Sequence, residues 1–163
     1  MDFRSDLIRS IMDADTVRPL VIGIPSRDDE IFVSKLSDPG IHEQFFRPIG
    51  GEIEFAEYSR DALVREFDEE LNISVTVGEY LGSIENVFEF AGRTRHEIVF
   101  VYDIEPMNEL WNVTQLEGKD DGGVTYTASW KSVAQFGSQE TPLYPNGLMK
   151  LLQSDTKLVT PRN

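Results

Sequence analysis

The stretch that decides the fold runs from Gly51 to Ile73 and reads GEIEFAEYSRDALVREFDEELNI. Between residues 59 and 71 its apolar side chains recur every three or four positions, which is typical of a helix that packs one face against a sheet. Three carboxylates, Glu66, Glu69 and Glu70, stand at i, i+3 and i+4 and therefore share a neighbouring face. The segment predicts an amphipathic helix with a concentrated negative charge on one turn.

This concentration of charge points to a metal ion. Like charges on one helical turn repel each other, at roughly a few tenths of a kcal/mol per exposed pair. The arrangement becomes favourable when a hard divalent cation lies among the carboxylates, because Mg²⁺ binds oxygen ligands and shares its coordination shell with phosphate groups and water. Upstream, Gly50 and Gly51 allow a positive φ and a close backbone approach, so their carbonyls can face the same ion. Arg65 is expected to pair with Glu57 and to clamp this predicted loop to the helix.

The same residues resemble the signature of the Nudix family. That signature is a Gly, five residues, a Glu, seven residues, and then Arg-Glu-apolar-any-Glu-Glu-any-Gly-apolar. Gly51 and Glu57 match its first two positions, and the run from Arg65 to Ile73 matches the rest except at one place, where Asn72 replaces Gly. Because Asn is the next best residue for a left-handed helix end, we expect this departure to cost some stability and little chemistry.

The resemblance implies a role for each matching position. Three glutamates correspond to the family's metal-binding carboxylates, the carbonyl before the signature to a backbone ligand, and the Glu57–Arg65 pair to a support for these ligands. The implied cofactor is Mg²⁺ or Mn²⁺. The predicted metal ligands are Gly50, Glu66, Glu69 and Glu70, and the predicted catalytic residues are Glu66, Glu69, Arg65 and Glu97.

The implied activity is divalent-metal-dependent hydrolysis of a phosphoanhydride bond in a nucleoside diphosphate linked to another moiety. A carboxylate must accept the proton of the attacking water. Within the signature we expect this base to be Glu66. Glu97, in His96-Glu97-Ile98 at the start of a predicted strand, and a carboxylate of the segment 105–123 are the alternatives. The substrate stays open among nucleotide sugars, ADP-ribose, dinucleoside polyphosphates and nucleoside triphosphates.

Two residues before the signature are candidates for substrate contact. The guanidinium of Arg47 can meet a phosphate with two parallel hydrogen bonds, or form an ordinary surface salt bridge. Phe46 can stack on a nucleobase, with packing in the core as its alternative.

Other functions are compatible with the same signature. A nucleotide-sensing module that keeps the fold without turnover is the main alternative, and the intact set of three glutamates argues against it. Isomerase chemistry on an isoprenoid diphosphate, which some relatives perform, usually relies on a cysteine, and this chain has none.

Composition limits the partners. The net charge of −14 repels phosphate backbones, so we expect a small nucleotide rather than polymeric nucleic acid as the ligand. The sequence contains no apolar run of the ~18 residues that span a bilayer, and its N-terminus lacks the pattern of a signal peptide. We therefore expect no membrane association and take the cytoplasm as the default location. Relatives in the family are often dimers, so a homodimer is among the expected states.

The rest of the chain predicts an α/β domain of the Nudix fold, a mixed β-sheet sandwiched between α-helices. A single domain is expected over residues 1–163, with 1–15 as a lead-in and 154–163 as a frayed tail. Residues 45–51 are expected to lead into a loop before the helix, and 105–123 to form a mobile loop. Short helices are expected at 132–136 and 146–153. The predicted strands cover 20–24, 31–36, 75–77, 80–90, 95–104 and 124–130.

Overall fold

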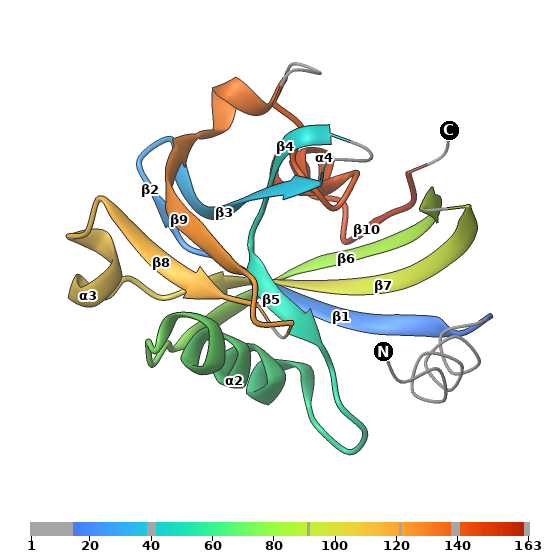
Figure 1. The fold of residues 1–163 in the computed structure, drawn as a ribbon, viewed down its shortest axis with the longest axis horizontal. Coiled ribbons are helices and arrows are strands. Elements are labelled where there is room, and N and C mark those ends of the chain that lie inside the picture. Colours follow the sequence, from blue (N-terminus) through green and yellow to red (C-terminus); the bar gives the residue numbers. More distant parts are fainter. Residues whose placement is uncertain (1–14, 39–41, 91, 121, 138–140, 162–163) are drawn as a thin grey trace.

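Two five-stranded sheets form the frame of the molecule (Figure 1). The computed structural model describes residues 15–38, 42–90, 92–120, 122–137 and 141–161. The first sheet has the order β10 (Leu158–Val159), β6 (Val77–Phe90), β7 (Arg93–Ile104), β1 (Val17–Ile24) and β5 (Ile49–Glu52). The second has the order β2 (Ser26–Arg27), β3 (Glu30–Asp38), β9 (Thr125–Ser132) and β8 (Gln115–Lys119), with β4 (His42–Arg47) also paired to β3.

The first sheet is mixed, as the sequence predicts. Strand β1 pairs parallel with β7 and antiparallel with β5, and β10 pairs parallel with β6. The helical elements are α2 (Ser59–Leu71), α3 (Asn108–Trp111), the 3₁₀ helix η1 (Val133–Gly137) and α4 (Leu148–Leu152). No helix of the described segments is long and apolar enough to cross a membrane.

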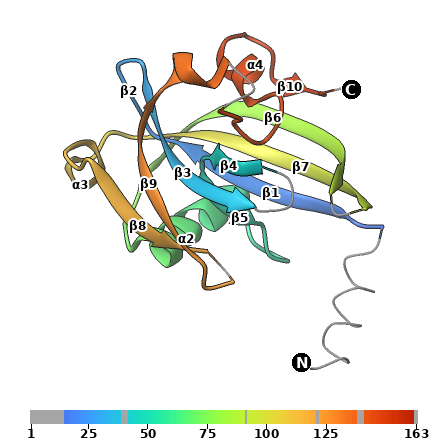
Figure 2. The same ribbon diagram turned by 45° about the horizontal axis from the view of Figure 1, so that its top comes forward.

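Helices lie on opposite sides of the first sheet. Figures 1 and 2 show α2 (green) on one side of β1, β6 and β7 and α4 on the other. Helix α2 buries Leu63 and Phe67 in one core cluster, together with Val21 of β1. Helix α4 buries Leu148 and Leu151 in a second cluster, which we call the α4-side core. The predicted arrangement of a mixed sheet between helices is therefore confirmed.

Helix α2 has the predicted bounds and ends as expected. Asn72 adopts the left-handed conformation, with φ 54° and ψ 42°, and its backbone N–H donates to the carbonyl of Asp68. Few residues other than Gly accept this conformation readily, and Asn is one of them. The helix end is thus formed in the usual way despite the missing glycine.

Three segments differ from the sequence-based expectations. The segment 45–51, expected to lead into a loop, lies largely in strands β4 and β5, and the predicted mobile loop at 105–123 contains α3 and β8. The predicted frayed tail contains β10, whose Val159 is only 3% exposed. Each of these strands is short or polar, so its pairing partners rather than its own sequence determine its conformation. Residues 1–14 of the predicted lead-in lie outside the described segments.

Candidate active site

The three predicted metal-binding carboxylates differ in exposure. Glu66 is 1% exposed and Glu70 is 7% exposed, whereas the side chain of Glu69 keeps 49% of its surface in solvent. Burial of a carboxylate is costly unless charged or hydrogen-bonding groups compensate it. Two buried carboxylates on consecutive turns of α2 therefore mark this face of the helix as more than a solvated surface.

The double glycine makes room for Glu66. A Cβ added to Gly51 would lie 2.4 Å from Oε1 of Glu66, so the carboxylate rests directly on the backbone of β5. A Cβ added to Gly50 would lie 1.9 Å from the carbonyl oxygen of Val21. The expected close approach is confirmed, and it needs no positive φ, because both glycines are paired with β1 as ordinary strand residues.

Arg65 joins the helix to the preceding segment. Its Nε and Nη2 donate to the two carboxylate oxygens of Glu57 at 2.8 and 2.9 Å, and Nη2 also donates to the carbonyl of Glu52 at 3.1 Å. The structure thus contains the predicted Glu57–Arg65 pair. The hydrogen bond from Arg65 holds the pKa of the Glu57 carboxyl below its ordinary value, and the same pair raises the pKa of Arg65.

The same guanidinium reaches the metal-binding candidates. Nη1 of Arg65 donates to Oε1 of Glu66 at 2.9 Å and to Oε2 of Glu69 at 3.2 Å. Arg65 therefore lies between two of the carboxylates that the sequence assigns to an ion. Within the described residues, no three acidic or histidine side chains are already gathered around one point as metal ligands.

A cavity of about 370 Å³ adjoins these carboxylates. The ring of Phe55 at its wall is fully exposed to solvent. Beside Arg65 there is consequently space for an ion and for a bound phosphate group. The residues that line the cavity are Glu52, Ile53, Glu54, Phe55, Arg65, Glu66 and Glu69.

The chemistry of this donor set fits Mg²⁺ or Mn²⁺, since all the candidate ligands offer oxygen. Glu66 is already seated at the cavity, and Glu69 is exposed enough to turn from Arg65 toward an ion. The residues present therefore fit a divalent cation, with a change in the contacts of Glu69.

Glu97 belongs to a different group of charges. On β7 it shares a face with Val99 and Val101, which pack in the α4-side core, whereas α2 covers the other face of the sheet. Its carboxylate lies 3.6 Å from Nη1 of Arg18, whose Nη2 is 3.2 Å from Oε2 of Glu52. We call Arg18, Glu52 and Glu97 the Arg18 cluster.

Among the described residues, Glu52 joins the Arg18 cluster to the α2 site, because its carbonyl accepts a hydrogen bond from Arg65. Burial raises the pKa of Glu97, and the charges of Arg18, Arg47 and Arg95 oppose this rise. Sequence reasoning missed Arg18 and Glu52, because only the pairing of β1 with β5 and β7 brings them together. The structure does not bring Glu97 to the helix carboxylates.

The two candidates for substrate contact, Phe46 and Arg47, differ in exposure. Phe46 is 7% exposed and its ring packs edge-on against Phe136 at 5.6 Å, so of its two alternatives the structure supports packing in the core rather than stacking on a nucleobase. Arg47 is exposed, and its charge acts on both Glu97 and Tyr126. Along a strand, alternate side chains face opposite ways, which is why neighbours differ in this manner.

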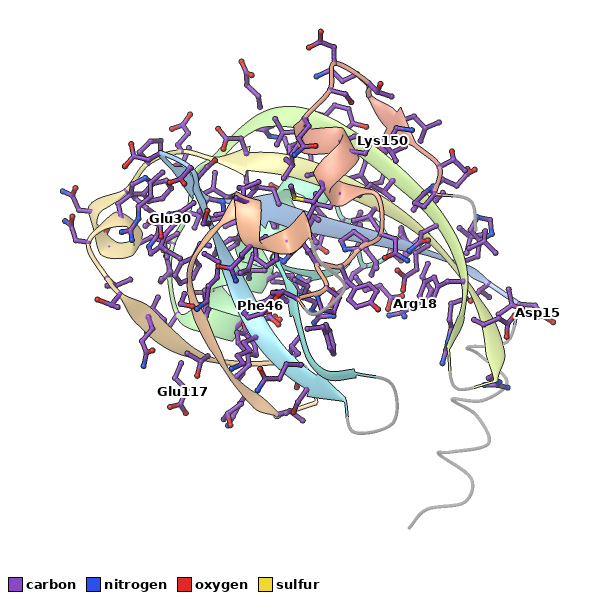
Figure 3. All side chains as sticks on the ribbon, turned by 90° about the horizontal axis from the view of Figure 1, so that it is seen from above. Asp15, Arg18, Glu30, Phe46, Glu117 and Lys150 are labelled. Atoms are coloured by element: carbon purple, nitrogen blue, oxygen red, sulfur yellow. The ribbon has the colours of Figure 1, made fainter. Side chains whose placement is uncertain are left out.

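Of the candidate acids in the segment 105–123, which are Glu117, Asp120 and Asp121, the two that the structure describes do not line the cavity beside Glu66. Figure 3 shows Glu117 at the edge of β8, away from Arg18 and Phe46, and its side chain is exposed. Oδ1 of Asp120 accepts a hydrogen bond from the backbone of Val124 at 2.8 Å, as in an ordinary turn. Asp121 lies outside the described residues.

Comparisons with known proteins agree with this geometry. A model of the NUDIX domain matches residues 17–148. The CTP pyrophosphohydrolase of Escherichia coli strain K12 is 38% identical over 77 residues, which are 47% of this chain and 56% of that protein. The chain thus matches little more than half the length of this curated relative.

Solved structures show the same fold. The solution structure of the E. coli ORF135 protein is 27% identical with a TM-score of 0.56, covering 85% of this chain and 87% of the other. The MutT NUDIX hydrolase from Burkholderia pseudomallei is 17% identical with a TM-score of 0.60, covering 87% of this chain and all of the other.

Proposed function

The chain belongs to the NUDIX family, and on this premise we propose that it hydrolyses a phosphoanhydride bond in a nucleoside diphosphate linked to another moiety, with a divalent cation. One observation carries the proposal: the carboxylate of Glu66 is 1% exposed, rests on Gly51 and lines a cavity of about 370 Å³. A buried carboxylate at a cavity wall is the kind of group that a charged ligand explains.

The ion would be held by Glu66, Glu69 and Glu70, with the carbonyl of Gly50 as a further ligand. When bound, Mg²⁺ or Mn²⁺ supplies positive charge against the diphosphate and makes a nearby water more acidic. The proposal requires Glu69 to exchange its hydrogen bond from Arg65 for a contact with the ion. Its half-exposed side chain makes that exchange sterically simple.

Side chains of the protein orient the site and accept the proton of the attacking water. Arg65, fixed by two hydrogen bonds to Glu57, holds one oxygen of Glu66 in place. We propose that Glu66 is the base that accepts the proton of the attacking water. Glu97 is the alternative base from the sequence, and burial raises its pKa, but its carboxylate lies in the Arg18 cluster rather than with the helix carboxylates, which favours Glu66.

Among the four substrate classes, we propose a nucleoside triphosphate, with CTP as the first to assay. Support comes from the name of the curated relative, a CTP pyrophosphohydrolase, although the match covers only part of both chains. The net charge of −14 also favours a small nucleotide over polymeric nucleic acid. The single domain over 1–163, the homodimer and the cytoplasmic location stay predictions from the sequence.

The test is a turnover assay of the full chain with Mg²⁺ or Mn²⁺. The panel is CTP, the other nucleoside triphosphates, nucleotide sugars, ADP-ribose and dinucleoside polyphosphates. We expect release of a nucleoside monophosphate, and we expect Glu66→Gln and Glu70→Gln each to lower kcat by about 10²-fold or more while the fold persists.

Asp68→Asn is the matched control, since Asp68 is an exposed carboxylate on the same helix. It removes the same charge and should leave turnover within about twofold. Equal turnover in Glu70→Gln and wild type would refute the assignment. Tight nucleotide binding without product for every substrate and metal would instead identify a sensor.

A further inference from the structure

Tyr126 is a buried phenol with no hydrogen-bond partner in the part of the chain that the structure describes. The residue is 6% exposed, and its hydroxyl forms no hydrogen bond with any described residue. Tyr102, 8% exposed, shows the usual situation: its hydroxyl and that of Ser59 are hydrogen-bonded at 2.7 Å. Because buried polar groups nearly always have a partner, the phenol of Tyr126 points to a partner outside the chain.

The space around this phenol is kept by a glycine. Gly118 of β8 lies opposite Tyr126 of β9 in the second sheet. A Cβ on Gly118 would lie 2.5 Å from the Tyr126 ring and 2.7 Å from its hydroxyl oxygen. The phenol therefore lies across the backbone of β8, the strand that packs against α2.

Charges of the α2 site act on Tyr126, together with those of Arg47 and Asp120. Burial raises the pKa of its phenol most, the charges of Glu70, Asp120 and Glu66 raise it further, and Arg47 lowers it. The phenol is thus neutral at physiological pH and can donate one hydrogen bond. Glu66 and Glu70 are carboxylates that can only accept when ionised, so the phenol adds a neutral donor to the charged donors of Arg65.

Tyr126 also borders open space. It lines a cavity of about 250 Å³ together with Lys35, Gln44 and residues of β3 and β9. Lys35 gives this cavity a positive charge, whereas the hydroxyl oxygen of Tyr126 is itself buried. An oxygen acceptor carrying negative charge suits a site with one neutral donor and nearby arginine and lysine.

We propose that Tyr126 is a positioning residue whose phenol donates a hydrogen bond to a phosphate oxygen of the substrate bound beside Glu66 and Glu70. This inference rests on the proposed function and adds a contact from the second sheet to a site otherwise built from α2 and β5. The contact joins the two sheets through the substrate.

The test is Tyr126→Phe, which removes one oxygen and keeps the ring. Two quantities are measured: kcat/KM for the best substrate, and the Kd of methylenediphosphonate, a non-hydrolysable diphosphate, in the presence of Mg²⁺. We expect kcat/KM to fall and the Kd to rise by about tenfold each, as for one lost hydrogen bond to a charged group. The Tm should stay unchanged or rise, since an unpartnered buried hydroxyl is removed.

Tyr102→Phe is the matched control, because it deletes a buried phenol that has a partner. It should lower the Tm and leave kcat/KM and the Kd within about twofold. Gly118→Ala provides a second route, since its methyl group displaces the phenol and should weaken methylenediphosphonate binding as Tyr126→Phe does. Affinity for Mn²⁺ alone should not change in Tyr126→Phe.

Unchanged kcat/KM and Kd in Tyr126→Phe would overturn the inference. A lowered Tm with unchanged Kd would also overturn it, and would show that the hydroxyl is hydrogen-bonded to a buried water instead. The binding measurement needs no turnover. If the wild type hydrolysed no nucleotide, the proposed function would fail. The Kd of methylenediphosphonate would still show whether Tyr126 contacts a bound diphosphate.

Discussion

At the scale of single residues, Gly50 and Gly51 are adjacent but face different neighbours. The first leaves room for the backbone of β1, at the carbonyl of Val21, and the second leaves room for the side chain of Glu66. A backbone neighbour cannot yield without separating two strands, whereas a carboxylate can rotate. Gly50 is therefore needed for the pairing of β1 with β5, whereas Gly51 is needed for the position of Glu66.

We expect Gly50→Ala to lower the free energy of unfolding by about 3 kcal/mol, because β1 and β5 must move apart. Gly51→Ala should fold with a smaller loss of stability, but displace Glu66 and weaken Mn²⁺ binding and turnover together. Urea denaturation and a Mn²⁺ titration measure these effects. Equal stability of Gly50→Ala and wild type would contradict the described pairing, and unchanged turnover in Gly51→Ala would contradict the role of Glu66.

At the scale of elements, the Glu57–Arg65 pair fixes the segment after β5 to helix α2. Both hydrogen bonds are short, and both side chains are largely buried, at 18% and 23% exposure. Bidentate pairs of this kind have defined geometry as well as energy. The pair therefore fixes the angle at which α2 presents its carboxylates to the cavity.

Glu57→Gln should lower the free energy of unfolding at pH 7 by about 1.5 kcal/mol, because a charge-assisted pair becomes a weaker neutral contact. The pKa of Glu57 is lowered from its ordinary value of 4.5, so the contribution of its charge is complete above that pH. It is lost as the pH falls through the lower pKa of the folded state.

The difference in stability between wild type and Glu57→Gln should consequently shrink below pH 4.5. Denaturation curves of both proteins from pH 3 to pH 7 measure it. A difference that stays constant across this range would show that the charge of Glu57 does not stabilise the fold.

At the scale of the whole molecule, the C-terminal residues close the α4-side core. Val159 of β10 is 3% exposed, and the backbone carbonyl of Lys157 accepts a hydrogen bond from Ser83 of β6 at 2.7 Å. The strand thus extends the first sheet beyond β6 and covers α4. The tail is part of the fold although it contributes only two residues to a strand.

Val159→Ala should lower the free energy of unfolding by about 2 kcal/mol, because it removes buried methyl groups and leaves a cavity. Leu158→Ala is the matched control: its side chain is 54% exposed, so its replacement should cost less than about 0.5 kcal/mol. Thermal or urea denaturation measures both. Similar values for the two variants would show that β10 does not pack as described.

The sequence by itself determined helix α2, its end at Asn72, the Glu57–Arg65 pair and the family. These features depend on residues close together in the chain, where the period of the helix and the spacing of the signature act directly. The main strands β3, β7 and β9 were also predicted within a few residues, since their apolar and β-branched side chains favour extended backbone.

Only the tertiary structure decided which charges meet. Arg18 lies opposite Glu97 because β1 and β7 are parallel neighbours, and the carboxylate of Glu66 rests on Gly51 because β5 packs against helix α2. The burial of Phe46, the strands β8 and β10, and the unpartnered phenol of Tyr126 depend likewise on long-range pairing. Such contacts form between segments far apart in the chain, and no local pattern encodes them.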